Sequence, residues 1–290
     1  MDGAIGTELY RKGIFINRCF EEANITDPSL VQSIHKNYVD SGSQVLTTNS
    51  WGANPVKLKS HNLDDKFEEM NERAVSIARE ASGGKSWIAG SVGPLGIPIE
   101  PFGPTSYAEA KEIFASQISI LYSTGIDLLT LETFSDLSEL KQAILAAQDI
   151  APNLPIMASV TINQEGTMPL GTDLEWAMKQ VYKWGASIFG LNCSVGPQPI
   201  FTAIEKHLNV TQKPISVRPN AGLPKVVDGR KIYMSTPEYF AHFAGEFLQL
   251  GVQLIGGCCG TTPNHIQAMS NALRHQTSMN GKTTPTVKTA

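Results

Sequence analysis

The sequence predicts an α/β fold, and within that class a (β/α)8 TIM barrel. Three observations predict it. The chain has 290 residues, close to the ~250 residues that one such barrel needs. Short, nearly continuous apolar runs alternate with longer segments of helical period, as strands buried on both faces alternate with their covering helices. Glycines stand where several helical segments give way to the next apolar run, as C-terminal helix caps do.

Seven apolar runs have the length and composition of buried parallel strands. They span residues 44–49, 87–91, 127–132, 156–161, 187–192, 215–218 and 253–257. Helical segments are expected at 28–41, 64–82, 106–123, 137–150, 173–184, 197–208, 236–250 and 263–275. Prolines at positions 28, 237 and 263 suit the first turn of a helix. The alternation of strand and helix indicates βαβ units with a parallel sheet.

A closed barrel needs an eighth strand before the first helix. The place for it lies upstream of Asp2, which only Met1 precedes. We therefore expect a first strand shortened at the N-terminus, rather than an imperfectly closed barrel. An open doubly wound sheet is the competing fold. No GxGxxG motif follows an early strand, which argues against the dinucleotide-binding version of that fold.

Domain organisation is expected to be simple. Residues 1–275 form one barrel, and residues 276–290, rich in Thr, Lys and Ser, form a linker or a disordered tail. A long loop rich in proline and glycine, 94–104, follows the second predicted strand. In a barrel, loops at the carboxyl ends of strands build the active face.

Composition excludes several classes of protein. Hydrophobic residues make up 41% and charged residues 17% of the chain, which excludes an intrinsically disordered protein. The net charge is −4 and no dense Lys/Arg run occurs, so neither nucleic acid nor a membrane is an expected partner. We find no apolar run of ~18 residues and no signal peptide. Four cysteines are too few for a disulfide scaffold and favour a cytoplasmic protein that keeps its thiols for chemistry.

The placement of the cysteines is the strongest chemical signal. Cys193 follows one predicted strand, and Cys258 and Cys259 follow the last one, flanked by glycines. A barrel brings both strand ends to one rim, where three thiolates suit a tetrahedral Zn²⁺ with its fourth position open. The alternative is that they are buried apolar cysteines, which a glycine-flanked Cys-Cys pair disfavours. Cys19 follows no predicted strand and has no flanking glycines, so it is predicted to be structural or incidental.

A zinc site with an open position suits a sulfur substrate. The metal lowers the pKa of a bound thiol, so that a thiolate exists at neutral pH. Such a thiolate can attack an electrophilic methyl group.

Five motifs carry a resemblance to a known family. They are Asp2-Gly3-Ala4-Ile5-Gly6-Thr7, Thr48-Asn49-Ser50-Trp51, Gly190-Leu191-Asn192-Cys193, Pro219-Asn220-Ala221-Gly222-Leu223-Pro224 and Gly256-Gly257-Cys258-Cys259-Gly260-Thr261. From Asp2 to about Arg274 the chain resembles the homocysteine S-methyltransferase family. The resemblance implies a zinc-binding (β/α)8 barrel with Cys193, Cys258 and Cys259 as ligands. It also implies that zinc-bound L-homocysteine thiolate is the nucleophile and L-methionine the product.

Several residues are candidates for binding the substrate. A carboxylate at Asp2 or Glu132 suits an amino group, and the resemblance supports both assignments. The backbone N–H groups of Gly3 and Ala4 would face the substrate carboxylate. The other candidates, at the ends of predicted strands, are Thr48, Asn49, Ser91 and Asn220. The alternative for Glu132 is an ion pair that closes the barrel rim, and for Asp2 a solvated terminal residue.

Arg218 departs from the family pattern, which more often has an aromatic or neutral polar residue before the Pro-Asn motif. Two roles stay open for it, a salt bridge at the rim and an anion contact for the methyl donor. Asn220 is expected to orient the cysteine rim or to line the donor side. The six histidines fall outside the strand ends and are predicted to be solvated or packed, rather than metal ligands.

The methyl donor is left open among methylcobalamin, methyltetrahydrofolate, S-methylmethionine, S-adenosylmethionine and betaine. Residues 219–230 look most like the homocysteine modules of cobalamin-dependent methionine synthase and of the bifunctional fusion with methylenetetrahydrofolate reductase. The chain has no cobalamin motif, so a folate- or cobalamin-binding domain is a candidate partner.

Two further hypotheses compete with the methyltransferase. One is a non-catalytic zinc- or thiol-binding protein, which the open coordination position and the two carboxylates disfavour. The other is a reductase or aldolase on the same barrel. Such barrels usually carry a Lys or a phosphate-binding loop where cysteines stand here.

Overall fold

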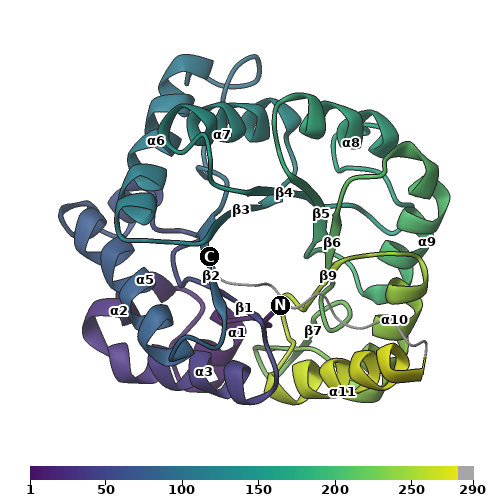
Figure 1. Ribbon diagram of the computed structural model, residues 1–290. Coiled ribbons are helices and arrows are strands. Elements are labelled where there is room, and N and C mark those ends of the chain that lie inside the picture. Colours follow the sequence, from purple (N-terminus) through teal and green to yellow (C-terminus); the bar gives the residue numbers. More distant parts are fainter. Residues whose placement is uncertain (280–290) are drawn as a thin grey trace.

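Seven parallel strands form one curled sheet in the computed structural model, which describes residues 1–279. They pair in the order β1-β2-β3-β4-β5-β6-β9. Their bounds are β1 (Val45–Thr47), β2 (Trp87–Val92), β3 (Leu128–Phe134), β4 (Ile156–Val160), β5 (Ile188–Asn192), β6 (Ile215–Arg218) and β9 (Leu254–Ile255). The strands make a ring inside a ring of helices (Figure 1). The predicted α/β barrel is confirmed, and each of the seven predicted strands is present.

The eight predicted helices are also present, with small shifts at their ends. They are α3 (Pro28–Asp40), α5 (Phe67–Ser82), α6 (Tyr107–Ser123), α7 (Leu137–Ile150), α8 (Leu174–Lys183), α9 (Pro197–His207), α10 (Pro237–Gln249) and α11 (Pro263–Met279). Several helices begin after an N-cap residue whose side chain accepts a hydrogen bond from a backbone N–H of the first turn. For the helices just given, these capping residues are Asp27, Ser106, Asp136, Asp173 and Thr236.

The first two residues close the barrel between β9 and β1. The Met1 nitrogen donates to the Ile255 carbonyl at 2.6 Å, and the Asp2 N–H donates to the Val45 carbonyl at 3.0 Å. The Gly257 N–H donates to the Asp2 carbonyl, also at 3.0 Å. This dipeptide therefore occupies the place of the eighth strand, and Figure 1 shows the N-terminal end between β1 and β9. A Cβ at Gly256 would approach Met1 and Asp2 to within 2.9 Å, so glycine permits this close approach.

Short elements in the loops were not predicted. They are α1 (Gly6–Arg11), α2 (Ala23–Thr26), α4 (Pro55–Ser60), and 3₁₀ turns at Phe20–Glu22 and Leu208–Val210. The first three residues of the helix predicted at 64–82 form a 3₁₀ turn, Asp64–Lys66. An antiparallel hairpin of β7 (Lys225–Val227) and β8 (Arg230–Ile232) also lies between β6 and α10. Its turn, Asp228-Gly229, has positive φ at both residues, which is what a two-residue hairpin turn requires.

The C-terminal helix α11 continues to Met279, beyond the boundary predicted at 275. Residues 280–290, the rest of the predicted linker or tail, lie outside the described residues. Among the helices of residues 1–279, none is both long enough and apolar enough to cross a bilayer.

Candidate active site

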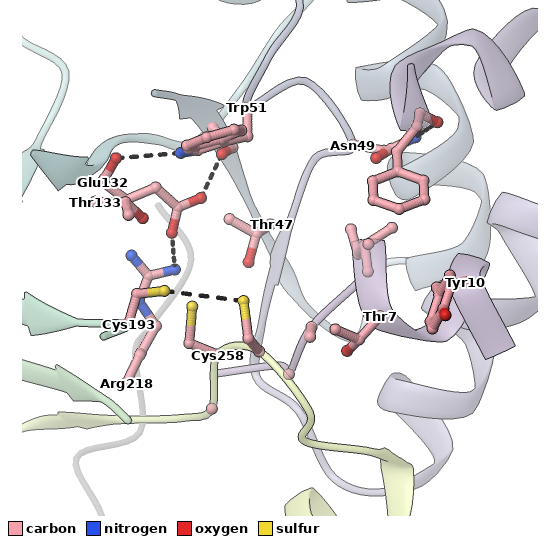
Figure 2. Close-up of a pocket in the computed structure, with 18 of the residues that line it drawn as sticks. Thr7, Tyr10, Thr47, Asn49, Trp51, Glu132, Thr133, Cys193, Arg218 and Cys258 are labelled. Atoms are coloured by element: carbon pink, nitrogen blue, oxygen red, sulfur yellow. Dashed lines mark hydrogen bonds and ion pairs between the residues drawn. The ribbon is translucent and has the colours of Figure 1, made fainter. Parts of the chain in front are cut away.

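A pocket opens at the carboxyl ends of the barrel strands, the face on which α/β barrels carry their active sites. Its volume of about 370 Å³ lies within the ~300–1,000 Å³ usual for small-molecule sites. Most of the predicted site residues line it: Gly3, Ala4, Thr48, Asn49, Ser91, Glu132, Cys193, Cys258 and Cys259. Asp2 and Asn220 are not among the residues that line it. Figure 2 shows the cysteine sulfurs pointing toward one another, with Glu132 beside Arg218.

The three predicted thiols form one cluster. The sulfur atoms of Cys193, Cys258 and Cys259 all lie within 4.8 Å of one another, and those of Cys193 and Cys259 are 3.8 Å apart. Two sulfurs on a tetrahedral Zn²⁺, with bonds of ~2.3 Å, would be separated by roughly 3.8 Å. The cluster therefore has the donor type and the spacing of a three-cysteine metal site.

The segment that follows β6 holds the backbone of all three cysteines. The N–H of Cys193 donates to the Arg218 carbonyl at 3.0 Å, and the N–H of Cys258 donates to the Pro219 carbonyl at 2.8 Å. The carbonyl of Cys259 accepts from the Ala221 N–H, also at 2.8 Å. The Pro-Asn-Ala motif thus lies between the two cysteine-bearing strand ends and sets the spacing of the thiols.

The backbone turns sharply at two of these strand ends. Thr133 and Cys193 have φ values of 69° and 63°, and Ser194 follows with 61°. The left-handed region is unfavourable for a β-branched residue such as Thr, and such conformations cluster at functional sites. Asn192 supports the turn at Thr133: its side-chain amide exchanges two 2.8 Å hydrogen bonds with Thr133, and it also contacts the Cys258 sulfur at 3.8 Å.

The surroundings of the three thiols favour their protonated form. Contacts among the thiols, together with burial, raise the pKa of Cys193 and Cys259 to about 12, and that of Cys258 further above its usual value. Three thiolates in this space repel one another unless a cation lies between them. A divalent metal supplies that charge, so the chemistry of the donor set fits a metal ion.

Glu132, at the end of β3, is held on both carboxylate oxygens. The Ser91 hydroxyl donates to Oε1, and the Arg218 guanidinium forms an ion pair with Oε2 through Nη1 at 2.6 Å. A second guanidinium nitrogen of Arg218 donates to the Thr130 hydroxyl at 3.1 Å. Of the two roles left open for Arg218, the structure therefore shows the salt bridge, and its partner is Glu132. A substrate contact made by Glu132 in addition to this ion pair stays a prediction.

The comparisons with known proteins agree with this geometry. The profile described as homocysteine S-methyltransferase matches residues 1–273, almost the whole chain. The chain belongs to the homocysteine S-methyltransferase family. The resemblance in its sequence motifs is thereby confirmed.

Among curated relatives, the methionine synthases of Mycobacterium tuberculosis and Mycobacterium leprae are each 31% identical to this chain over 94% of its length. The chain spans 24% of the length of each of these relatives. Among solved structures, the homocysteine methyltransferase MmuM of Escherichia coli is similar in its metallated form, with 24% identity and a TM-score of 0.79. The apo form has 25% identity and a TM-score of 0.74. In both cases the match covers 93% of this chain and 94% of the other.

The N-terminal motif of this family member lies beside the cluster. The carboxylate of Asp2 is buried and accepts both the N–H of Thr47, at 2.7 Å, and the Thr47 hydroxyl. Burial raises the pKa of Asp2 to about 6, against the effect of these hydrogen bonds. The N–H of Ala4 donates to the Thr261 hydroxyl at 3.2 Å, so that donor is already engaged. The roles predicted for Asp2, Gly3 and Ala4 in substrate binding stay predictions.

The polar wall predicted from the strand ends has internal partners. The Thr48 hydroxyl accepts the N–H of Ser91 at 2.9 Å, and the Asn49 amide donates to the Phe20 carbonyl at 3.0 Å. Asn49 thereby fixes the loop that carries Phe20, which also lines the pocket. These residues shape the wall, and their direct contact with substrate stays a prediction.

One wall of the pocket is an aromatic ring that sequence reasoning did not select. The Trp51 indole N–H donates to the Glu132 carbonyl at 3.2 Å, and the Lys57 ammonium lies 3.6 Å from the centre of its ring. Gly93, on the neighbouring loop, donates its N–H to the Trp51 carbonyl at 2.9 Å. A Cβ at Gly93 would overlap the indole, so this position requires glycine. Trp51 belongs to the Thr48-Asn49-Ser50-Trp51 motif, but its contacts in the structure, Glu132 and Gly93, are distant from it in sequence.

A second wall comes from residues 222–235, the hairpin loop. Lys231 and Tyr233 of this loop line the pocket. The Tyr233 ring lies directly over Gly260, where a Cβ would overlap it. At the end of the loop, the Ser235 carbonyl contacts the His265 ring at 2.9 Å. The Asp-Gly turn was the signal in the sequence from which this hairpin was predictable.

The remaining predicted residues lie outside the pocket. Asn220 is buried within the segment that holds the cysteines, and its N–H donates to the Val195 carbonyl at 2.9 Å. The buried Cys19 thiol donates to the Glu21 carboxylate at 3.3 Å, a structural contact outside the thiol cluster. Among residues 1–279, the thiol cluster includes no histidine, and His265 instead bonds to Thr262 and to the hairpin loop.

Proposed function

We propose that this chain transfers a methyl group to the thiol of L-homocysteine and forms L-methionine. The observation that carries the proposal is the thiol cluster, which opens into the same pocket as a fixed carboxylate. The reaction forms a sulfur–carbon bond as the donor's bond to the methyl group breaks, and the substrate thiol loses its proton. Membership of the homocysteine S-methyltransferase family supports the same reaction.

We further propose that the metal is zinc, held by Cys193, Cys258 and Cys259. Three sulfur donors with a fourth position open are typical of zinc sites that act on a substrate. A similar protein, MmuM of Escherichia coli, has a solved metallated form. Zinc, when bound, supplies a Lewis acid that lowers the pKa of a substrate thiol, and three sulfur ligands leave that thiolate electron-rich.

The residues around the metal site would orient the amino acid. Glu132 keeps lone pairs free after bonding to Ser91 and Arg218, because a carboxylate has about four acceptor positions. We assign the substrate ammonium group to these positions. The N-terminal segment at Gly3 lines the pocket and offers a backbone N–H to the substrate carboxylate. Trp51 and Tyr233 would cover the reacting sulfur and exclude water.

The methyl donor can be supplied in two ways, either to a self-sufficient enzyme or to a module of a larger enzyme. Each has an observation in its favour. The chain matches nearly the whole length of MmuM, as a self-sufficient methyltransferase would. It also matches methionine synthases at 31% identity over 24% of their length, as a homocysteine-binding module of a larger cobalamin- or folate-dependent enzyme would. The higher identity favours the module, whose methyl donor would arrive on a separate domain or protein. A reducing cytoplasm suits either arrangement, because the thiols must stay reduced.

The test is methionine formation from homocysteine in reducing buffer with zinc, using a panel of donors. The panel contains S-methylmethionine, S-adenosylmethionine, betaine, methylcobalamin and methyltetrahydrofolate. Turnover with S-methylmethionine, S-adenosylmethionine or betaine indicates a self-sufficient enzyme. Turnover with methylcobalamin alone, or only after a folate- or cobalamin-binding partner is added, indicates the module. Zinc uptake without methionine formation under any of these conditions would leave a non-catalytic zinc- or thiol-binding protein.

A matched pair of variants tests the metal. Cys258→Ser should abolish both zinc retention and methionine formation, because it removes one of three ligands. Cys19→Ser makes the same chemical change outside the cluster and should retain the zinc content of the wild type. Full activity in metal-free Cys258→Ser protein would contradict the zinc mechanism.

A further inference from the structure

Arg218 and Glu132 form a buried ion pair across the barrel. Arg218 ends β6 and Glu132 lies in β3, with β4 and β5 between them in the sheet. Their charged atoms are 2.6 Å apart, and their side chains are 4% and 11% exposed. Removing two charges from water is costly, and apolar residues often replace such pairs without loss of stability. Stability alone is therefore a weak explanation for this pair.

The contacts of Arg218 fix the orientation of the Glu132 carboxylate. Its two terminal nitrogens reach two side chains of the same strand, the Oε2 atom of Glu132 and the Thr130 hydroxyl. Ser91, on the adjacent strand β2, bonds to the other carboxylate oxygen. The carboxylate is thus held from two directions, so it cannot rotate to follow a ligand.

The held carboxylate faces the thiol cluster. Glu132, Arg218 and Cys258 all line one pocket. The residue after Glu132 is Thr133, which Asn192 bonds twice while also contacting the Cys258 sulfur. A ligand whose thiol lies at the cluster therefore has a fixed anionic acceptor within the same pocket.

We propose that Arg218 is a positioning residue that makes Glu132 the specificity-determining receptor for the ammonium group of the substrate. This inference rests on the proposed function, in which the substrate is a thiol amino acid. Arg218 holds Oε2, Ser91 holds Oε1, and the remaining lone pairs of the carboxylate meet the substrate ammonium. Without the guanidinium, the carboxylate loses its fixed orientation, and the site loses its preference for amino acids over simple thiol acids.

The experiment compares two ligands that differ by one amino group. Homocysteine and 4-mercaptobutanoate are titrated into zinc-loaded protein by calorimetry, which requires no methyl donor. Arg218→Met should weaken homocysteine binding by roughly 10- to 100-fold, as expected for a lost charge-assisted contact. The affinity for 4-mercaptobutanoate should stay within about 3-fold of the wild type, since that ligand has no ammonium group. Arg218→Lys, which keeps the charge, should restore part of the preference.

Three further variants keep the inference falsifiable. Thr130→Val removes only the second anchor of the guanidinium and should reduce the preference in the same direction, even if Arg218→Met fails to fold. Arg79→Met breaks an ion pair with Asp127 away from the pocket and should leave the preference unchanged. In a Glu132→Gln background, Arg218→Met should reduce the preference no further.

The outcomes separate this inference from the proposed function. If Arg218→Met and Thr130→Val weakened the binding of both ligands equally, Arg218 would only stabilise the barrel. That result would overturn this inference and leave the proposed function standing. A wild-type protein that binds zinc but neither thiol would overturn the proposed function, and this inference with it.

Discussion

Asn192 and Thr133 hold each other through two hydrogen bonds, although they lie on strands that are not neighbours in the sheet. The Asn192 amide oxygen accepts the Thr133 N–H, and its amide nitrogen donates to the Thr133 hydroxyl, both at 2.8 Å. Thr133 has a φ of 69°, a conformation that costs ~1–3 kcal/mol for such a residue. The amide of Asn192 therefore stabilises the turn that aims Glu132 into the pocket.

Asn192→Ala should lower the free energy of unfolding by about 3 kcal/mol, because it leaves the partly buried Thr133 N–H without its acceptor and frees a strained turn. The measurement is urea unfolding of the metal-free protein, so that the contact with Cys258 does not contribute through the metal. Thr133→Val is the matched variant, since it removes only the hydroxyl and should cost about 1 kcal/mol. An Asn192→Ala protein as stable as the wild type would show that the turn does not depend on this amide.

Gly93→Ala should displace the Trp51 ring, because the added Cβ would overlap the indole. The hydrogen bond from the indole to the Glu132 carbonyl and the stacking of Lys57 on the ring would both be lost. We expect a stability loss of about 1–3 kcal/mol, as for other overpacked sites, and weaker homocysteine binding. Calorimetry and urea unfolding check the two effects.

Gly196→Ala is the control for this change. A Cβ at Gly196 would lie 3.6 Å from the Cα of Gly222, an ordinary contact, so neither stability nor binding should change appreciably. If the two alanine variants behaved alike, the contact between Gly93 and Trp51 would not determine the shape of the pocket.

The sequence identifies the chemistry of the site better than its contacts. The cysteines were predictable because parallel strands of a barrel end on one face, so positions at strand ends converge whatever the detailed packing. The bond between Asn192 and Thr133 was not predictable, because it joins residues 59 positions apart through rotamers that no local pattern specifies. Arg218 shows where prediction from sequence ends. The sequence was compatible with an ion pair or an anion contact for this residue, and only the position of Glu132 in the structure decides between them.

The same distinction between local patterns and long-range contacts explains which parts of the fold were predictable. Buried strands and capped helices have local signals, and all of those predicted are present. The closure of the barrel by Met1 and Asp2 has no such local signal, because two residues show no periodicity. It depends on the Val45 carbonyl of β1, the Ile255 carbonyl of β9 and the N–H of Gly257 just after β9, which are more than 40 residues from Asp2 along the chain. The sequence indicated where the eighth strand belongs, and the structure places Met1 and Asp2 there, between β9 and β1.

Glu139 should make stability depend on pH. Burial raises the pKa of Glu139 from 4.5 to about 7, and the nearby carboxylate of Asp136 acts in the same direction. Between these values the folded protein binds a proton that the unfolded chain has released. The contribution of Glu139 to stability is therefore fully present below pH 4.5 and falls as pH rises to about 7. The loss corresponds to about 3 kcal/mol.

Glu139→Gln should remove this dependence, because an amide does not titrate and its oxygen can still accept the Leu95 N–H, now at 2.7 Å from Glu139. Unfolding free energies of both proteins, measured from pH 4.5 to 8, check the effect. Relative to the wild type, the variant should gain stability as pH rises through this window. A difference that stays constant over the whole range would contradict the assignment.

Tyr233 should protect the thiol cluster from outside reagents. Its ring lies over Gly260, next to Cys259, and lines the pocket from the hairpin loop. Tyr233→Ala removes this cover, so a chelator should withdraw zinc from the protein roughly 10-fold faster, as with other residues that support a metal site. Tyr233→Phe keeps the ring and should release zinc at close to the wild-type rate. The release is followed with a chromogenic chelator, and equal rates in all three proteins would mean that the hairpin loop leaves the cluster open to solvent.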